Sequence, residues 1–334
     1  MNEWAIQPAQ PDPRDYPFAV KVQPFLVEAD GNRPKKIGRS RLYMRDQGQF
    51  GSCGGQAIAD AIDLRQGVMA SALFAYRHAK AIDGIEGEGT DVRSLMKVAK
   101  DIGVCREELY QYSLYKKPLV FPDIPKEATD DAAKRKIEGY ARCVTRDELL
   151  TAIWQYRSVV CGILVATNFI TGLEYSSAGA FVDLPEGYIQ GGHAIDLIDY
   201  DEDLTHTYKD GNTYKGFCLL ANSWGPDWGQ NGCAWIPFDF LFGKLIDLGV
   251  PYAWDMFAPI EEFPYQEEWF EMDVAPFMQS NRTFTPARFV AEALGAKVGW
   301  HPEDGQGRVS MEAPGVMVEM WIDSKRYRVQ RGVK

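Results

Sequence analysis

Residues 46–56 of the sequence, DQGQFGSCGGQ, place a cysteine among closely spaced glycines. A cysteine attacks a substrate only as a thiolate, and its ordinary pKa of about 8.5 leaves few thiolates at neutral pH. Apolar residues recur at helical spacing after Ser52, which we expect to cap a helix that ends at Gly67. Cys53 then lies in the first turn, where the partial positive charge of the helix lowers the pKa of the thiol. The alternative interpretation is a buried thiol with a structural role.

A histidine must complete the activation by taking the thiol proton and later delivering it to a leaving amine. The sequence has four histidines, of which His193 is the candidate because two glycines precede it and it opens the apolar strand GGHAIDLIDY. The others are expected in ordinary surroundings: His78 on a solvated helix face, His206 in a hairpin and His301 in a turn. The alternative for His193 is a core histidine whose hydrogen bonds are satisfied locally.

The histidine needs a partner that fixes its tautomer, and the tetrahedral intermediate needs hydrogen-bond donors at its negative oxygen. Asn222 ends a predicted strand and is the candidate partner, with Trp224 placed to cover the hydrogen bond between His193 and Asn222. The side-chain amide of Gln47 and the backbone N–H of Cys53 are the candidate donors. Gln47 as an ordinary loop residue and Trp224 as a core aromatic remain the alternatives.

These residues need a scaffold, and the periodicity changes along the chain. The first half favours helices and the second half favours strands, which predicts an α+β domain with a cleft between a helical part and an antiparallel β part. Residues 123–140 are predicted to form a surface connection, and the acidic run 199–203 a solvated turn. The expected helices are 52–67, 71–80, 91–103 and 146–157, and the expected strands are 159–166, 191–200, 205–222 and 232–240.

Composition limits the partners. Lys and Arg total 36 against 47 Asp and Glu, a formal net charge of -11, which argues against a nucleic-acid partner. The chain lacks the run of about 18 apolar residues that membrane insertion requires. No signal peptide is visible, so we expect a cytoplasmic protein, with release by lysis or another non-signal route left open. The six cysteines form no Cys-x-x-Cys pair, which favours free thiols.

The blocks DQGQFGSCGG, GGHAIDLIDYDED and NSWGPDWGQNG, in this order, resemble the three signature blocks of the papain-like (C1) cysteine peptidases. PDPRDYPF is similar to the start of the bacterial branch, and the resemblance covers roughly residues 11–260. It implies a papain-like fold and hydrolysis of peptide or protein substrates through an acyl-enzyme. By position it implies Cys53 as nucleophile, His193 as general acid/base, Asn222 as its orienter and Gln47 as oxyanion-hole donor.

Two departures from the family pattern surround the nucleophile. The family has a cysteine three residues before it and an aromatic residue just after it, where this chain has Phe50 and Gly54. Gly54 and Gly55 weaken the helix start by up to about 1 kcal/mol each. One alternative function is therefore a catalytically inactive relative that binds peptides in the cleft. Another is a hydrolase or acyltransferase that acts on cell-wall peptides.

The character of the chain changes again near residue 262, which predicts a peptidase domain at 1–262 and a second domain at 263–334. The segment NRTFTPARFVAEALGAKV resembles the small module named after the N-terminal domain of copper amine oxidases. A helix at 285–295 followed by four strands is expected there, as a small α/β accessory domain. Its implied role is attachment to a cell-surface or protein partner. His301 has no accompanying ligand cluster, so we expect no metal and no other cofactor.

Overall fold

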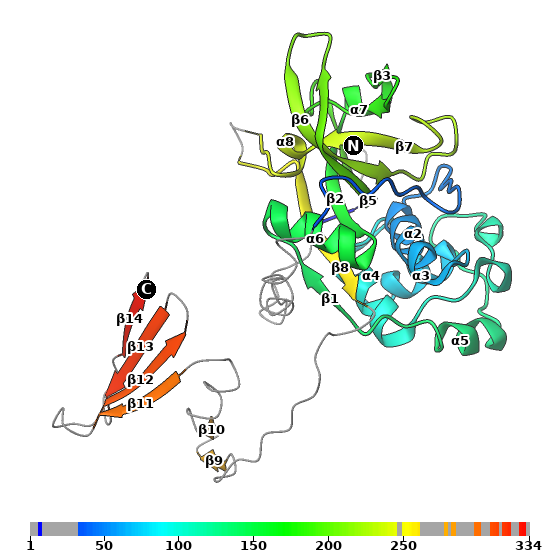
Figure 1. Ribbon diagram of the computed structural model, residues 1–334. Coiled ribbons are helices and arrows are strands. Elements are labelled where there is room, and N and C mark those ends of the chain that lie inside the picture. Colours follow the sequence, from blue (N-terminus) through cyan, green and yellow to red (C-terminus); the bar gives the residue numbers. More distant parts are fainter. Residues whose placement is uncertain are drawn as a thin grey trace. The chain divides into compact units, whose positions relative to one another are not determined.

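The computed structural model describes residues 6–8, 33–245 and 249–260, together with strands in the C-terminal part of the chain (Figure 1). The chain forms two compact units, Met1–Pro264 and Tyr265–Lys334. Within the described residues, no helix is both long enough and apolar enough to cross a bilayer.

The helices of the first unit precede most of its strands, as the α+β prediction requires. The longest, α2, carries Cys53 at its first position and is buried along most of its length. Helix α4 continues directly into a π-helical turn that ends at Gly103. The helical elements are α2 (Cys53–Gln66), α3 (Ala72–Lys80), α4 (Val92–Lys97), η1 (Val98–Ile102), η2 (Glu107–Leu109), η3 (Tyr112–Leu114), α5 (Lys126–Ala132), α6 (Arg146–Tyr156), α7 (Thr167–Thr171) and α8 (Phe238–Leu241).

The two ends of α2 differ in how well they follow the prediction. Gly67 ends the helix in the left-handed conformation, with φ at 67°, as expected for a glycine at this position. Ser52 occupies the N-cap position, but its side chain makes no capping hydrogen bond. Its hydroxyl instead lies 2.5 Å from the hydroxyl of Tyr112. The predicted side-chain cap is therefore wrong, because a residue distant in sequence competes for the Ser52 hydroxyl.

The predicted surface connection at 123–140 is also only partly right, because it contains helix α5. Ala128 and Ala132, one turn apart, are fully buried in a cluster with Cys105 and Tyr110. Most charged residues of the segment are exposed around this narrow apolar stripe, whereas Asp131 is partly buried and bonds Arg106. Two alanines gave too weak a periodic signal to predict the helix.

The strands of the first unit form one sheet in the order β1-β8-β2-β5-β6-β7-β4-β3, with β4 and β7 parallel and every other pair antiparallel. Strand β5 lies in its middle and carries His193. The strands are β1 (Gly139–Arg142), β2 (Val159–Ala166), β3 (Glu174–Ser176), β4 (Gly179–Phe181), β5 (Ile189–Thr207), β6 (Thr213–Ala221), β7 (Cys233–Pro237) and β8 (Ala253–Ile260).

The acidic run 199–203 belongs to β5 and is not a solvated turn. Asp199 is buried and accepts hydrogen bonds from the backbone N–H groups of Gly38 (3.2 Å) and Arg39 (2.7 Å). Its carboxylate thereby holds the segment that precedes α2 against the sheet. The sequence pattern suggested solvent because it does not show this distant partner.

The helical part packs on the sheet through a shared core. Helix α2 contacts β5 and α4 contacts β8, and Figure 1 shows these helices gathered beside the two strands. A single apolar cluster contains residues from α2, α3 and α4 and from β2, β5 and β8, Cys53 among them. The predicted α+β class, with a helical part and a β part, is confirmed.

The second unit is described only through its strands. A two-stranded antiparallel sheet pairs β9 (Phe277–Gln279) with β10 (Arg282–Phe284). A four-stranded antiparallel sheet has the order β11 (Lys297–His301), β12 (Arg308–Ala313), β13 (Val316–Trp321) and β14 (Tyr327–Arg331). The four strands predicted in this region are present. The helix predicted at 285–295 lies outside the described residues.

Candidate active site

A cleft of about 630 Å³ opens between the helical part and the β part. One wall consists of residues 47–51 and Glu88, and the other includes residues 190–193, Ile170 and Trp224. The N-terminus of α2 and the start of β5 therefore meet at this cleft. Both parts of the domain contribute to it, as the sequence analysis expected.

Cys53 is fully buried beside this cleft, at the first position of α2. Its Sγ accepts a hydrogen bond from the backbone N–H of Ala194, at 3.4 Å. Ala194 directly follows His193 in β5, so the sulfur is held against the strand that carries the histidine. Burial raises the pKa of the Cys53 thiol to about 11, although nearby backbone N–H groups oppose the shift.

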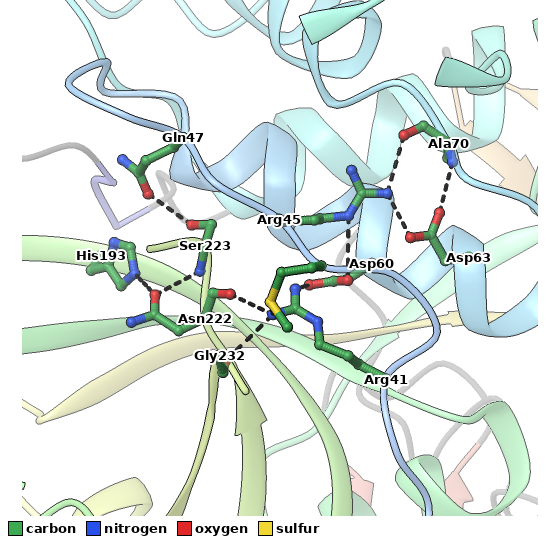
Figure 2. Close-up of polar contacts among 11 residues, drawn as sticks. Arg41, Arg45, Gln47, Asp60, Asp63, Ala70, His193, Asn222, Ser223 and Gly232 are labelled. Atoms are coloured by element: carbon green, nitrogen blue, oxygen red, sulfur yellow. Dashed lines mark hydrogen bonds and ion pairs between the residues drawn. The ribbon is translucent and has the colours of Figure 1, made fainter. Parts of the chain in front are cut away.

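His193 is almost fully buried, and its Nε2 lies 2.7 Å from Oδ1 of Asn222. The same Oδ1 accepts a hydrogen bond from the backbone N–H of Ser223, at 2.8 Å, so it is the acceptor side of the amide. Nε2 must therefore carry a proton and donate it to Asn222. Figure 2 shows the imidazole and this amide facing each other. Nδ1 is left as the nitrogen that can exchange a proton with a thiol.

The pKa values of Cys53 and His193 move apart. Burial lowers the pKa of His193 to about 4, and its hydrogen bond to Asn222 only partly offsets this. The thiol loses its proton at about 11. Between about pH 4 and pH 11, Cys53 Sγ and His193 Nδ1 therefore share one exchangeable proton, in addition to the proton that stays on Nε2. This proton lies either on the sulfur or on Nδ1.

Aromatic rings enclose the histidine. The Trp224 ring centroid lies 4.8 Å from that of His193, and Phe169 packs edge-on against Trp224 at 5.5 Å. Trp228 stacks on Phe169 at 5.3 Å. This wall keeps water from the His193–Asn222 hydrogen bond, which strengthens it. Trp224 thus lies over His193, as expected from the sequence.

Gln47 is held with its amide nitrogen toward the cleft. Its Oε1 accepts a hydrogen bond from the Ser223 hydroxyl at 2.7 Å, and its Nε2 donates one to the Phe50 carbonyl at 2.8 Å. An amide nitrogen carries two hydrogens, so one N–H of Gln47 remains for a bound ligand. Sequence reasoning missed Ser223, whose position beside Asn222 was the only available signal.

A buried ion network joins the two parts of the domain behind these residues (Figure 2). Arg41 donates to the backbone carbonyl of Asn222 at 2.7 Å and is paired with Asp60 of α2. Arg45 bonds Asp63 at 2.6 Å and also reaches Asp60 at 3.3 Å. The helix that carries Cys53 is thereby tied to the turn that carries Asn222. This network could not be predicted from the sequence, because residues 33–46 lack periodicity.

The glycines after Cys53 are explained by close packing. A Cβ on Gly54 would lie 2.7 Å from Leu95 Cδ1 and 2.8 Å from Thr90 Cγ2, with Ile6 Cδ1 at 3.5 Å. A Cβ on Gly55 would meet backbone and side-chain atoms of α3 at 2.6 and 2.7 Å. The space beside the nucleophile is therefore filled by neighbouring residues. An aromatic side chain at position 54 does not fit it.

The six cysteines, all among the described residues, are free thiols, as expected. Phe50 stands where the family pattern has a cysteine, and its ring packs against Tyr115 with centroids 4.4 Å apart. This aromatic contact packs the loop before α2 against the segment that carries Tyr115.

Family models match both parts of the chain. The model of the papain family cysteine protease matches residues 39–239, and that of the copper amine oxidase N-terminal domain matches residues 265–334. An uncharacterized peptidase C1-like protein of Acanthamoeba polyphaga mimivirus is 28% identical over 248 residues, which are 68% of this chain and 75% of that protein. A cathepsin B-like protein of Giardia intestinalis is 44% identical over 46 residues, 14% of this chain and 13% of that protein.

Solved structures with the same fold include Xylellain, a cysteine protease from Xylella fastidiosa. It superimposes with a TM-score of 0.60 at 22% identity, covering 78% of this chain and 96% of that one. A procathepsin B from Trypanosoma congolense gives a TM-score of 0.51 at 15% identity, covering 77% and 87%. The predicted papain-like fold is confirmed by these likenesses.

Proposed function

This chain belongs to the papain family of cysteine proteases, and we propose that it hydrolyses peptide bonds through a triad of Cys53, His193 and Asn222. The observation that carries the proposal is the 2.7 Å contact between His193 Nε2 and Asn222 Oδ1, which leaves Nδ1 for the thiol. The backbone N–H of Ala194 donates a hydrogen bond to the Cys53 sulfur, and Ala194 directly follows that histidine in β5.

The first half of the reaction forms an acyl-enzyme. The thiol proton passes to Nδ1 of His193 as Sγ of Cys53 attacks the carbonyl carbon. The negative oxygen of the tetrahedral intermediate accepts hydrogen bonds from Gln47 Nε2 and the Cys53 backbone N–H. His193 then gives its proton to the amine nitrogen, the C–N bond breaks, and the acyl group stays on sulfur as a thioester.

The second half releases the acyl group. A water molecule gives a proton to His193 while its oxygen attacks the thioester carbonyl, and the C–S bond breaks as the second intermediate collapses. The carboxylic acid leaves, and His193 returns its proton from Nδ1 to the Cys53 sulfur released by this cleavage. Asn222 keeps the same ring nitrogen engaged throughout, so one imidazole nitrogen serves all four proton transfers.

A digest of a mixed peptide library by the full chain tests this function. We expect cleavage by the wild type and by a Cys143→Ala control, which also removes a buried thiol, and no cleavage by Cys53→Ala. Circular dichroism confirms that both variants fold. Peptide binding without any cleavage by the wild type would support a catalytically inactive peptide-binding protein. Cleavage of cell-wall fragments in preference to linear peptides would support the wall-peptide function.

The second unit is proposed to attach the peptidase to a protein or cell-surface partner. The family match over residues 265–334 supports this role, because the module is separate from the part of the chain that forms the cleft. We also infer a cytoplasmic location and a place in the bacterial branch of the family, for which the sequence patterns are the support.

A further inference from the structure

The residues that line the cleft include only two with ionisable side chains, His193 and Glu88. His193 takes part in the proposed chemistry, whereas Glu88 has no role in it. Within the described residues, no lysine or arginine lies close enough to Glu88 to form an ion pair. A carboxylate in a substrate cleft without a cation beside it is unusual, because a partly buried charge is normally paired.

Glu88 is held close to the nucleophile. Its Oε1 accepts a hydrogen bond from the backbone N–H of Gly51 at 3.1 Å, and Gly51 is two residues before Cys53. A Cβ on Gly51 would lie only 2.8 Å from Cβ of Glu88, so glycine is what permits this approach. The hydroxyl of Tyr115 also hydrogen-bonds the Glu88 side chain, and two hydrogen bonds use only part of the acceptor capacity of a carboxylate. The remainder is available to a ligand in the cleft.

Glu88 lies close enough to three tyrosines to act on their hydroxyl groups. Burial raises the pKa values of Tyr76, Tyr112 and Tyr115, and the charge of Glu88 raises all three further. All three tyrosines carry hydroxyl groups and none supplies a positive charge, and the described residues place no lysine or arginine at ion-pair distance from Glu88. Any cation that pairs with Glu88 in the described structure must therefore come from the cleft side.

Phe50 adds an aromatic wall to the same region. It lines the cleft immediately before Gly51, and its ring is fixed against Tyr115. A guanidinium can stack on an aromatic ring while its N–H groups bond a carboxylate in a fork, whereas an ammonium makes only a point contact. A carboxylate next to an aromatic ring is thus better suited to arginine than to lysine.

We propose that Glu88 and Phe50 form a subsite for a basic substrate side chain, with arginine preferred, next to the bond that is cleaved. This inference rests on the proposed peptidase function and specifies its substrate class. It also gives a role to Phe50, which stands where the family pattern has a cysteine. Glu88 is a specificity-determining residue in this account, since it touches the substrate side chain and not the reacting atoms.

The test uses the full chain and fluorogenic peptides that differ at one position, scanned over three residues on each side of the cleaved bond. In each set of peptides the scanned position carries arginine, lysine or citrulline, and citrulline is the neutral counterpart of arginine. We expect kcat/KM for the arginine peptide to exceed that for citrulline by about 10- to 100-fold at one position, the range for a hydrogen bond between charged groups. The lysine peptide should fall between them, and added salt should reduce the preference.

Variants then show which residues produce the preference for arginine. Glu88→Gln should lower the arginine-to-citrulline ratio about 10-fold or more, and Phe50→Leu should lower the arginine-to-lysine ratio. Glu86→Gln is the matched control, because Glu86 is an exposed acidic residue of the same loop that does not line the cleft. Its ratio should equal that of the wild type. Because each readout is a ratio within one protein, partial unfolding of a variant does not imitate the effect.

Two results would overturn the subsite while leaving the peptidase intact: equal wild-type rates on arginine and citrulline at every position, or an unchanged ratio in Glu88→Gln. Failure of the proposed function looks different. In that case Cys53→Ala would cleave as well as the wild type, or no peptide would be cleaved at all.

Discussion

Arg41 donates a hydrogen bond to the backbone carbonyl of Asn222, 181 positions later in the chain, at 2.7 Å. The other side of its guanidinium is paired with Asp60 on helix α2, seven residues after Cys53. Both side chains are buried, with 6% and 4% of their surface exposed. This single arginine therefore fixes the spacing between the helix that carries the thiol and the turn that carries the amide.

Replacement of Arg41 by methionine is expected to destabilise the protein and slow catalysis. It leaves the Asp60 carboxylate with less compensation in the interior, which typically costs about 3–5 kcal/mol. Urea unfolding measures this loss, and kinetics should show a lower kcat with little change in KM, because Arg41 does not line the cleft. Arg41→Lys should lose less free energy of unfolding and less kcat than Arg41→Met.

The control for Arg41 is the exposed pair Lys126–Asp130, whose side chains are 82% and 53% exposed. Lys126→Met should leave the free energy of unfolding close to that of the wild type, because water and salt screen an exposed ion pair. Equal, small effects of Arg41→Met and Lys126→Met on stability and on kcat would show that the buried pair does not position the site.

Alanine at position 54 is expected to destabilise α2, although alanine is the better helix former by about 1 kcal/mol. The added methyl group would lie 2.7 Å from Leu95, and overpacking of this kind costs about 1–3 kcal/mol. A double-mutant cycle with Leu95→Ala measures the contact. If Gly54→Ala is more stable than the wild type, the space beside Cys53 is not filled as described.

Replacement of Gln47 or Ser223 by alanine should slow peptide hydrolysis but should not slow the reaction of the Cys53 thiol with an alkylating reagent. Removal of one oxyanion donor costs about 10²- to 10³-fold in kcat, which is the loss expected for Gln47→Ala. Ser223→Ala should cost less, since it only frees Gln47 to rotate. Alkylation of Cys53 by iodoacetamide involves no oxyanion, so both variants should keep its rate. A parallel loss of alkylation would mean that Gln47 acts on the thiol.

The stability of the protein should depend on pH through His193. Unfolded, a histidine takes up a proton as the pH falls through 6.5, whereas folded His193 does so only near 4. The unfolded state binds more protons in this window, so the free energy of unfolding falls as the pH drops from about 6.5 to 4. The contribution is at most about 3 kcal/mol.

Comparison with His193→Gln isolates this contribution. Asp63, whose pKa burial raises to about 7, has the opposite dependence: its stabilisation is present at low pH and is lost as the pH rises through 7. Asp63 is present in both proteins and cancels in the difference. Urea unfolding at pH 7 and pH 4.5 should show a smaller acid loss in His193→Gln. If the free energy of unfolding falls by the same amount in the wild type and in His193→Gln, the imidazole of His193 is exposed to solvent and not buried.

Much of the site was predictable because local patterns carry it. The helix after Ser52, the strand that begins near His193 and the strand that ends before Asn222 follow from periodicity and turn residues. Each element extends over enough residues for its apolar face to be recognised. The α+β class follows from their order along the chain.

The rest depends on contacts between distant segments. Arg41 and Glu88 lie in stretches without periodicity, and their roles arise only when the fold brings partners from elsewhere to them. The fit of Gly54 also depends on Leu95, Thr90 and Ile6, none of which is its neighbour in sequence. Local propensity cannot encode such packing, so these features required the structure.

The central claim is that His193 makes Cys53 a nucleophile, and the pH dependence of Cys53 alkylation tests it most directly. A thiol with a pKa of about 11 has roughly one thiolate in 10⁴ at pH 7, so rapid reaction there requires the imidazole. Peptide mapping by mass spectrometry follows Cys53, with buried Cys161 as an internal control. We predict a wild-type rate that rises near pH 4 and stays level to beyond pH 9, and loss of this plateau in His193→Ala. A wild-type rate that rises only toward pH 11 and is unchanged in His193→Ala would contradict the account.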